Sequence, residues 1–85
     1  MKTFVYTVTE ETGIHARPAA QLAKEARKYA SELTISANGG SADLKKLVAM
    51  LRLCIKKGDE VTVTVRGETE DADHTVLKAY FEENL

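Results

Sequence analysis

The chain has 85 residues, of which 44% are hydrophobic and 29% charged, and its formal net charge is −1. This length supports one core and one domain over residues 1–85, and the composition excludes a disordered tail. The near balance of charge argues against nucleic-acid binding. Cys54 is the only cysteine, which excludes an internal disulfide and a cysteine zinc cluster. No segment has the roughly 20 apolar residues of a membrane span, so we expect a cytoplasmic protein without membrane insertion.

The first third of the chain predicts a strand, a loop and a helix. Residues Thr3–Val8 alternate in polarity and are rich in β-branched and aromatic side chains, which is typical of a strand. After the polar loop Thr9–Ile14, a helix is expected from Ala16 to about Ala30. Pro18 fits its first turn, where the missing N–H has no intrahelical partner. The expected apolar stripe of this helix is Ala19, Leu22, Ala23, Ala26 and Ala30.

The remaining chain predicts three more strands and two helices. Leu33–Ala37 alternates in polarity, and the following Asn38-Gly39-Gly40 favours a hairpin into a short strand at 41–42. Asp43 is expected to cap a helix from about Leu44 to Leu53. Val61–Val65 is the clearest strand, and a last helix is expected over about 69–83, with acidic residues near its positive end.

This order, βαββαβα, together with the antiparallel hairpin predicts an α+β fold. Two layers are expected: an open-faced sandwich in which helices cover one face of a four-stranded antiparallel sheet. Strands and helices both supply the core. The predicted core residues are Val5, Leu22, Ala26, Leu33, Ile35, Leu53, Val61, Val63, Val65, Val76, Leu77 and Tyr80.

The stretch TGIHARPAA, residues 12–20, places His15 where the first helix begins. If His15 is the N-cap, the first backbone N–H groups lack acceptors, and the helix dipole favours an anion there. Arg17 adds a fork of donors suited to phosphate oxygens. These groups are what a protein needs to accept a phosphoryl group on nitrogen and to pass it on. A structural histidine, packed or capping the helix, is the alternative.

Gly13-Ile14-His15-Ala16-Arg17-Pro18-Ala19 resembles the active-site signature of the HPr family, the histidine-containing phosphocarriers of the bacterial sugar phosphotransferase system. The resemblance continues at Leu44, Lys45 and Leu53 and through residues 55–61, and the predicted element order is the family's. It implies that Nδ1 of His15 takes a phosphoryl group from Enzyme I and passes it to a IIA component of a sugar transporter. It also implies that Arg17 and the backbone amides of Ala16 and Arg17 contact the phosphate. The resemblance implies no metal or cofactor, because the donor and acceptor surfaces complete the site, and it implies a carrier rather than an enzyme.

The segment Leu44–Ile55 is apolar almost all round, so part of it is expected to lie exposed as a docking surface. A helix buried on two sides, or a dimer contact, is the alternative. The resemblance places Leu47, Val48 and Leu51 outward and Leu44, Met50 and Leu53 inward, with basic residues that attract acidic partners around the outward ones. The expected partner-binding residues are Thr12, Ala20, Lys24, Arg27, Leu47, Val48, Leu51 and Arg52.

Three residues need separate interpretations. Many HPr proteins of Gram-positive bacteria carry a serine at the position of Lys46, which an ATP-dependent kinase phosphorylates to stop transfer; we expect that switch to be absent here. Cys54 is expected to be a small buried hydrophobe, with a redox role as the alternative. His74 is expected on the solvated surface, although its spacing from Asp71 also fits a two-residue metal contact.

Two other functions are alternatives to a phosphocarrier. The chain could be an HPr-like regulatory module that docks on a transcription factor or an enzyme, with His15 only as a signal, or a ligand-binding domain without phosphorylation. The regulatory module would have transcriptional regulators among its partners. The lysines and arginines of the chain lack aromatic stacking partners, so nucleic acid is not expected as a ligand. A monomer is adequate for a shuttle.

Overall fold

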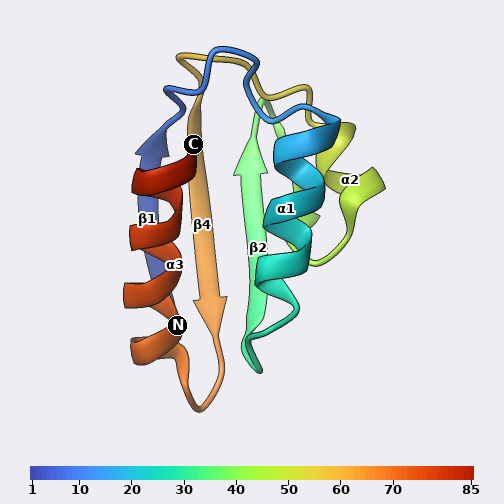
Figure 1. Cartoon of the computed structure of the whole chain (residues 1–85). Helices are drawn as coiled ribbons and strands as arrows, with labels where there is room; N and C mark the ends of the chain where they lie inside the picture. Colours follow the sequence, from blue (N-terminus) through green and yellow to red (C-terminus); the bar gives the residue numbers. More distant parts are fainter.

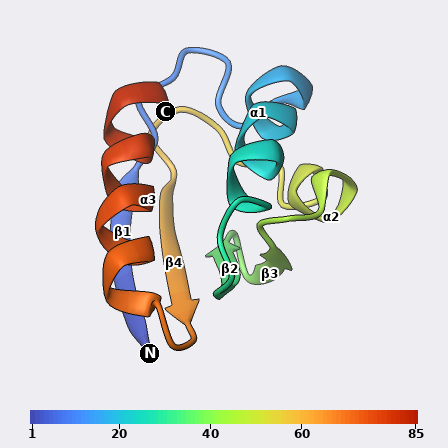
Figure 2. The same cartoon turned by 60° about the horizontal axis from the view of Figure 1, so that its bottom comes forward.

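A computed structural model of the protein describes all 85 residues. Four strands form one antiparallel sheet in the order β1-β4-β2-β3, and α1 and α3 lie against one face of it (Figures 1 and 2). The predicted open-faced α+β sandwich of order βαββαβα is therefore confirmed. The elements are β1 (Lys2–Thr7), α1 (Ala16–Ala26), β2 (Glu32–Ala37), β3 (Gly40–Asp43), α2 (Leu47–Leu51), β4 (Glu60–Arg66) and α3 (Glu70–Asn84). None of the helices combines the length and apolarity needed to cross a membrane.

Alternation along the strands separates a buried face from an open one. In β4, Val61, Val63 and Val65 are buried, whereas Thr62 and Thr64 point to the other face and stay partly exposed. The buried face packs against the helices in a single hydrophobic cluster. The predicted core residues that the structure confirms are Leu22, Ala26, Leu33, Ile35, Leu53, Val61, Val63, Val65 and Leu77.

The prediction that Val5 belongs to the core is wrong, because this residue of β1 is 55% exposed. The strand register sets Phe4 opposite Val63 and Val5 opposite Thr62, so Phe4 takes the inward position. Its ring packs edge-on against Phe81 of α3, with 5.3 Å between the centroids. An alternating strand with apolar residues on both faces gives the period but not which face is buried.

The buried stripe along α3 shares only Leu77 with the core residues predicted for this helix. Leu77, Phe81 and Leu85 lie four residues apart and are buried. Val76 lies beside this stripe and is 52% exposed, so its prediction as a core residue is wrong. Tyr80 is half-buried and packs against the core, which confirms its prediction only in part.

Helix α1 ends at Ala26, four residues before its predicted end. Lys28 and Tyr29 donate their backbone N–H groups to carbonyls three residues earlier, so the helix tightens and then stops. Ala30 is consequently exposed, and its prediction as part of the apolar stripe is wrong.

Helix α2 spans five residues rather than the ten predicted. The N–H of Leu44 bonds to the carbonyl of Leu33 at 3.0 Å, which continues the pairing of β2 and β3, and Lys46 is the N-cap. Asp43 Oδ1 accepts the N–H of Lys45 at 2.9 Å. Asp43 therefore closes a turn before the helix and does not cap the helix itself.

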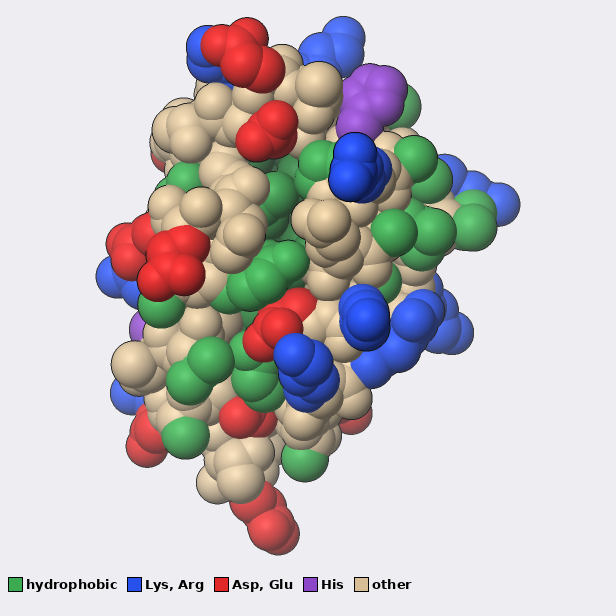
Figure 3. Space-filling model, viewed as in Figure 1, with side chains coloured by type: hydrophobic (Ala, Val, Ile, Leu, Met, Phe, Trp, Pro, Cys, Tyr) green, Lys and Arg blue, Asp and Glu red, His purple; other side chains and the backbone are tan.

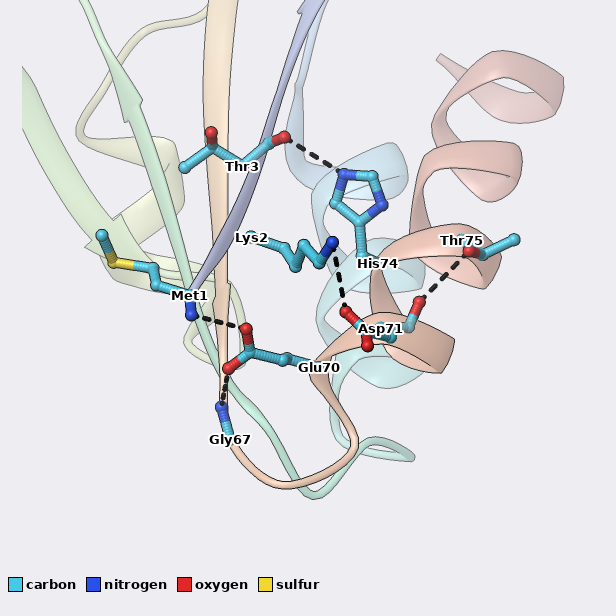
Figure 4. A network of polar contacts seen from close by, with 8 residues as sticks. All are labelled: Met1, Lys2, Thr3, Gly67, Glu70, Asp71, His74 and Thr75. Carbon is cyan, nitrogen blue, oxygen red and sulfur yellow. Dashed lines mark hydrogen bonds and ion pairs between the residues drawn. The ribbon is translucent and has the colours of Figure 1, made fainter.

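His74 lies half-buried at the surface and joins α3 to β1, so its prediction as a solvated surface residue is confirmed only in part (Figure 4). Its Nε2 lies 3.1 Å from the backbone carbonyl oxygen of Thr3, which can only accept, so Nε2 carries the proton. The ring also packs edge-on against Phe4, with centroids 5.5 Å apart. Asp71 pairs with Lys2 at 3.3 Å instead of meeting His74.

Candidate functional site

His15 is the N-cap of α1, with extended backbone dihedrals of φ −83° and ψ −177°. Its side chain is exposed and makes no capping hydrogen bond, while its carbonyl accepts the N–H of Ala19 at 2.8 Å. The N–H groups of Ala16 and Arg17 have no acceptor, as expected in the first helical turn, and Pro18 has no N–H to satisfy. The imidazole is therefore exposed and without a hydrogen bond, and the next two residues, Ala16 and Arg17, have backbone N–H groups with no acceptor.

The loop before His15 rests on the loop between α2 and β4, and Figure 1 shows the two side by side at one end of the sheet. The N–H of Ile14 donates to the carbonyl of Ile55 at 3.0 Å. Gly13 has φ +65°, and a Cβ there would lie 2.4 Å from the Ile55 carbonyl oxygen and 2.7 Å from Lys56 Cα. Only glycine fits this close approach, which fixes the direction from which the chain reaches His15.

A hollow of about 580 Å³ opens beside His15, between the start of α1 and the end of α3. Figure 1 shows these two helix ends at the same end of the molecule. Arg17 lines this hollow and forms no ion pair, so its guanidinium is available to an incoming anion. The lining residues are Glu10, Thr12, His15, Ala16, Arg17, Pro18, Gln21, Tyr80, Asn84 and Leu85.

Four polar residues of this hollow were not identified as site residues from the sequence, and one of them, Glu10, lies in the loop before His15. Gln21 follows Arg17 by four positions on one helical face, and that spacing could have indicated it. Tyr80 and Asn84 come from α3 at the other end of the chain. Only the packing of α3 beside α1 brings them here, so no local signal in the sequence could have found them.

A second hollow, of about 310 Å³, is also lined by His15 and includes Leu51 of α2 in its lining. Two predicted docking residues, Thr12 and Leu51, therefore line the same hollow as the predicted phosphoryl acceptor. Cys54 also lines this hollow and is exposed, with a left-handed φ of +52° between the buried Leu53 and Ile55. The prediction of a buried Cys54 is wrong, because the left-handed turn directs its side chain outward.

An apolar patch, defined here as Leu47, Val48 and Leu51, lies on α2. Val48 is 61% exposed and the two leucines are half-buried. Thr12 and Ala20, the two other uncharged residues expected at the docking surface, are exposed. The three residues expected to face inward, and found buried, are Leu44, Met50 and Leu53.

Exposed basic side chains lie on or next to the two helices α1 and α2, which contact each other. Lys24 is exposed on α1, Arg27 is exposed directly after α1, and Arg52 is exposed directly after α2. Arg27 Nε donates to the carbonyl of Lys45 at 3.2 Å, which ties α1 to the start of α2, where Lys46 is exposed. Figure 3 shows these kinds of side chain together: lysine and arginine lie beside hydrophobic atoms over α1 and α2, and most acidic side chains lie elsewhere on that view.

Comparison with known proteins finds one family over nearly the whole chain. The family model described as PTS HPr component phosphorylation site matches residues 2–83. The phosphocarrier protein HPr of Mycoplasma capricolum is 41% identical over 76 residues, which are 89% of this chain and 83% of that protein. A solved histidine-containing phosphocarrier protein from a mycoplasma has a TM-score of 0.89 and 35% identity, covering 96% and 93% of the two chains. Crh, a Bacillus subtilis catabolite repression protein solved as a swapped dimer, has a TM-score of 0.75 and 31% identity, covering 94% and 92%.

Proposed function

Because the chain belongs to the HPr family of phosphotransferase-system phosphocarriers, we propose that His15 is the residue that carries its phosphoryl group. The observation that carries this proposal is the exposed imidazole at the start of α1, beside the free N–H groups of Ala16 and Arg17. A carrier needs a nucleophile that partners can reach from outside. An N-cap histidine with no capping bond meets that requirement.

In the proposed reaction, the lone pair of His15 Nδ1 attacks the phosphorus of a phosphohistidine on Enzyme I. A new N–P bond forms, the donor N–P bond breaks, and the donor imidazole keeps the electron pair. The guanidinium of Arg17 and the amides of Ala16 and Arg17 hold the phosphoryl oxygens during transfer, since positioning and charge stabilisation dominate phosphoryl-transfer catalysis. Transfer to a histidine of a IIA domain repeats the same step with the protein as donor.

Partner docking is assigned to the apolar patch and to the cations around it. Val48 supplies exposed apolar area, Leu51 reaches the hollow beside His15, and Lys24, Arg27 and Arg52 favour acidic partner surfaces. One surface therefore serves Enzyme I and IIA in turn. We place this exchange in the cytoplasm, with the protein acting as a monomer and without nucleic acid, metal or cofactor.

The direct test is phosphorylation with Enzyme I and labelled phosphoenolpyruvate, followed by addition of a IIA domain. The wild type should acquire acid-labile label and pass it on. His15→Ala should acquire none, and Arg17→Lys should lose about 10- to 100-fold in rate, because lysine keeps the charge without the fork of donors. Labelling of His15→Ala would overturn the assignment. Label that is accepted but never passed to IIA would instead indicate a regulatory module.

Regulation by a serine kinase is proposed to be absent. Lys46 occupies the N-cap of α2, so no hydroxyl is available there. The nearest serine along the chain, Ser41, lies in β3 within the hairpin. Incubation with HPr kinase and ATP should leave the protein unmodified, and Lys46→Ser should restore phosphorylation. Stoichiometric label on any serine of the wild type would contradict this proposal.

A further inference from the structure

We propose that Asn38 and Asp59 are positioning residues for His15, acting through the loop of residues 53–59 that supports the start of α1. The inference rests on the proposed role of His15 as the phosphoryl acceptor. Neither side chain lines the hollows beside His15, so neither contacts the reacting atoms. Both act at a distance, through hydrogen bonds to a loop that has no regular secondary structure of its own.

Asn38 ties the β2–β3 hairpin to this loop. Its Nδ2 donates to the carbonyl of Leu53 at 2.9 Å and to Asp59 Oδ2 at 3.2 Å, so its two amide hydrogens hold both ends of the loop. Its backbone has φ +52° in the Asn-Gly turn, a conformation that asparagine and glycine adopt more readily than other residues. The hairpin turn thus directs the Asn38 amide at the loop.

Asp59 closes the loop from within. Its Oδ2 also accepts the backbone N–H of Lys56 at 2.9 Å, while its own N–H donates to the carbonyl of Lys56 at 3.0 Å. The Lys56 N–H and then the Asn38 amide lower the pKa of the Asp59 carboxyl, so the carboxylate that accepts both bonds is the form the fold favours. The carbonyl of Asp59 accepts the N–H of Val8, which anchors this side of the loop to the end of β1.

The loop of residues 53–59 contacts the segment directly before His15. Ile55 is buried, and its carbonyl accepts the N–H of Ile14 at 3.0 Å, one residue before His15. Gly13 lies against the same carbonyl so closely that a Cβ would collide with it. A shift of the Ile55 carbonyl must therefore displace Ile14, and with it the N-cap at which the imidazole is attached.

The test distinguishes the side-chain hydrogen bonds of Asn38 and Asp59 from the backbone conformation of the hairpin turn. Asn38→Gly keeps the left-handed turn and removes the amide, while Asp59→Ala removes the acceptor. Each variant should lower kcat for phosphoryl transfer by about 10-fold, less than the roughly 100-fold effect of a full ångström of misplacement. KM for Enzyme I should change little, because the apolar patch is untouched. Asp59→Asn, which keeps an acceptor oxygen, should restore most of the rate lost in Asp59→Ala.

Two readouts report the mechanism itself. Hydrogen exchange of the Ile14 amide should become at least about 10-fold faster in Asn38→Gly and Asp59→Ala, since its acceptor is no longer held. The double variant should be no slower in transfer than the worse single variant, because both changes release the same loop. The control for general destabilisation is Ser31→Ala, which removes a part-buried hydrogen bond to Asp73 in another part of the fold.

The outcomes are distinct. A wild-type transfer rate in Asn38→Gly and Asp59→Ala would contradict the positioning role of these two residues. So would a loss of transfer rate in Asn38→Gly that is no greater than the loss in Ser31→Ala when the two variants are equally stable. So would unchanged exchange at Ile14. A wild type that Enzyme I never phosphorylates on His15 would instead defeat the proposed function, and the exchange measurement would still decide whether Asn38 and Asp59 hold the loop.

Discussion

At the scale of single residues, Gly13 shows how the backbone rather than a functional side chain positions the candidate acceptor. Its φ of +65° and its contact with the Ile55 carbonyl are two separate requirements, one conformational and one steric. Gly58 offers a natural comparison, because it has φ +90° and nothing within 4 Å of an added Cβ. Both glycines need a left-handed backbone conformation, and only Gly13 also needs the space that a Cβ would take up.

We expect Gly13→Ala to reduce the free energy of unfolding by about 2–5 kcal/mol, the sum of a strained backbone and an overpacked contact. Gly58→Ala should lose about 1–2 kcal/mol, from the left-handed conformation alone. Denaturant unfolding measures both values. Transfer from Enzyme I should fall only in Gly13→Ala, at temperatures where both variants are folded. Equal losses of stability would contradict the steric part of the argument.

At the scale of elements, helix α2 shows what its sequence could and could not predict. A segment that is apolar almost all round predicted exposed apolar area, and Val48 is indeed 61% exposed while Met50 is fully buried. Its length was not predictable, because Leu44 pairs with Leu33 across the sheet and so delays the helix. That contact spans eleven positions of the chain, and no local propensity reports it.

The division of α2 into an inward and an outward side predicts opposite effects for neighbouring residues. Met50→Ala should reduce the free energy of unfolding by about 2–5 kcal/mol, because it leaves a cavity in the core. Val48→Ser should change it by less than about 0.5 kcal/mol and should weaken binding to Enzyme I by roughly 5- to 10-fold. Unfolding curves and calorimetric titration give the two quantities. A large stability loss in Val48→Ser, or unchanged binding, would contradict the docking assignment.

The strands also differ in whether their own sequence predicts which face is buried. Val61, Val63 and Val65 alternate with threonines, so polarity alone identified the buried face of β4. In β1, Phe4 and Val5 are both apolar, and only the pairing with β4 decides that Phe4 points inward. The candidate site follows the same rule: the motif around His15 was predictable, whereas Tyr80 enters the hollow through the packing of α3.

At the scale of the whole molecule, carboxylates with lowered pKa values link distant parts of the chain. Asp73 of α3 accepts hydrogen bonds from Ser31 Oγ, just before β2, at 2.6 Å and from Thr69 Oγ1 at 2.8 Å. The Ser31 bond is the main cause that lowers the pKa of Asp73. Glu70 is affected similarly, because the N-terminal ammonium group bonds to it and lowers its pKa. When these two carboxylates are ionised, their contacts connect α3 to the start of β1 and to the start of β2.

Acid should therefore weaken the fold in a defined direction. A carboxyl group whose pKa is lower in the folded protein than in the unfolded chain binds fewer protons when folded, so its stabilisation is complete above the unfolded value, near pH 4. We expect the denaturant midpoint to be nearly constant from pH 7 to about pH 5 and to fall as the pH drops through about 4 toward the lowered values. Asp73→Asn should lower the midpoint at pH 7 and flatten the decline below pH 4, because the variant has no proton to bind there. Glu83→Gln, an exposed change on the same helix without a hydrogen-bonded partner, should leave the decline as steep as in the wild type. An equal flattening in both variants would mean that the overall charge of the molecule, and not the Ser31–Asp73 link, governs its acid unfolding.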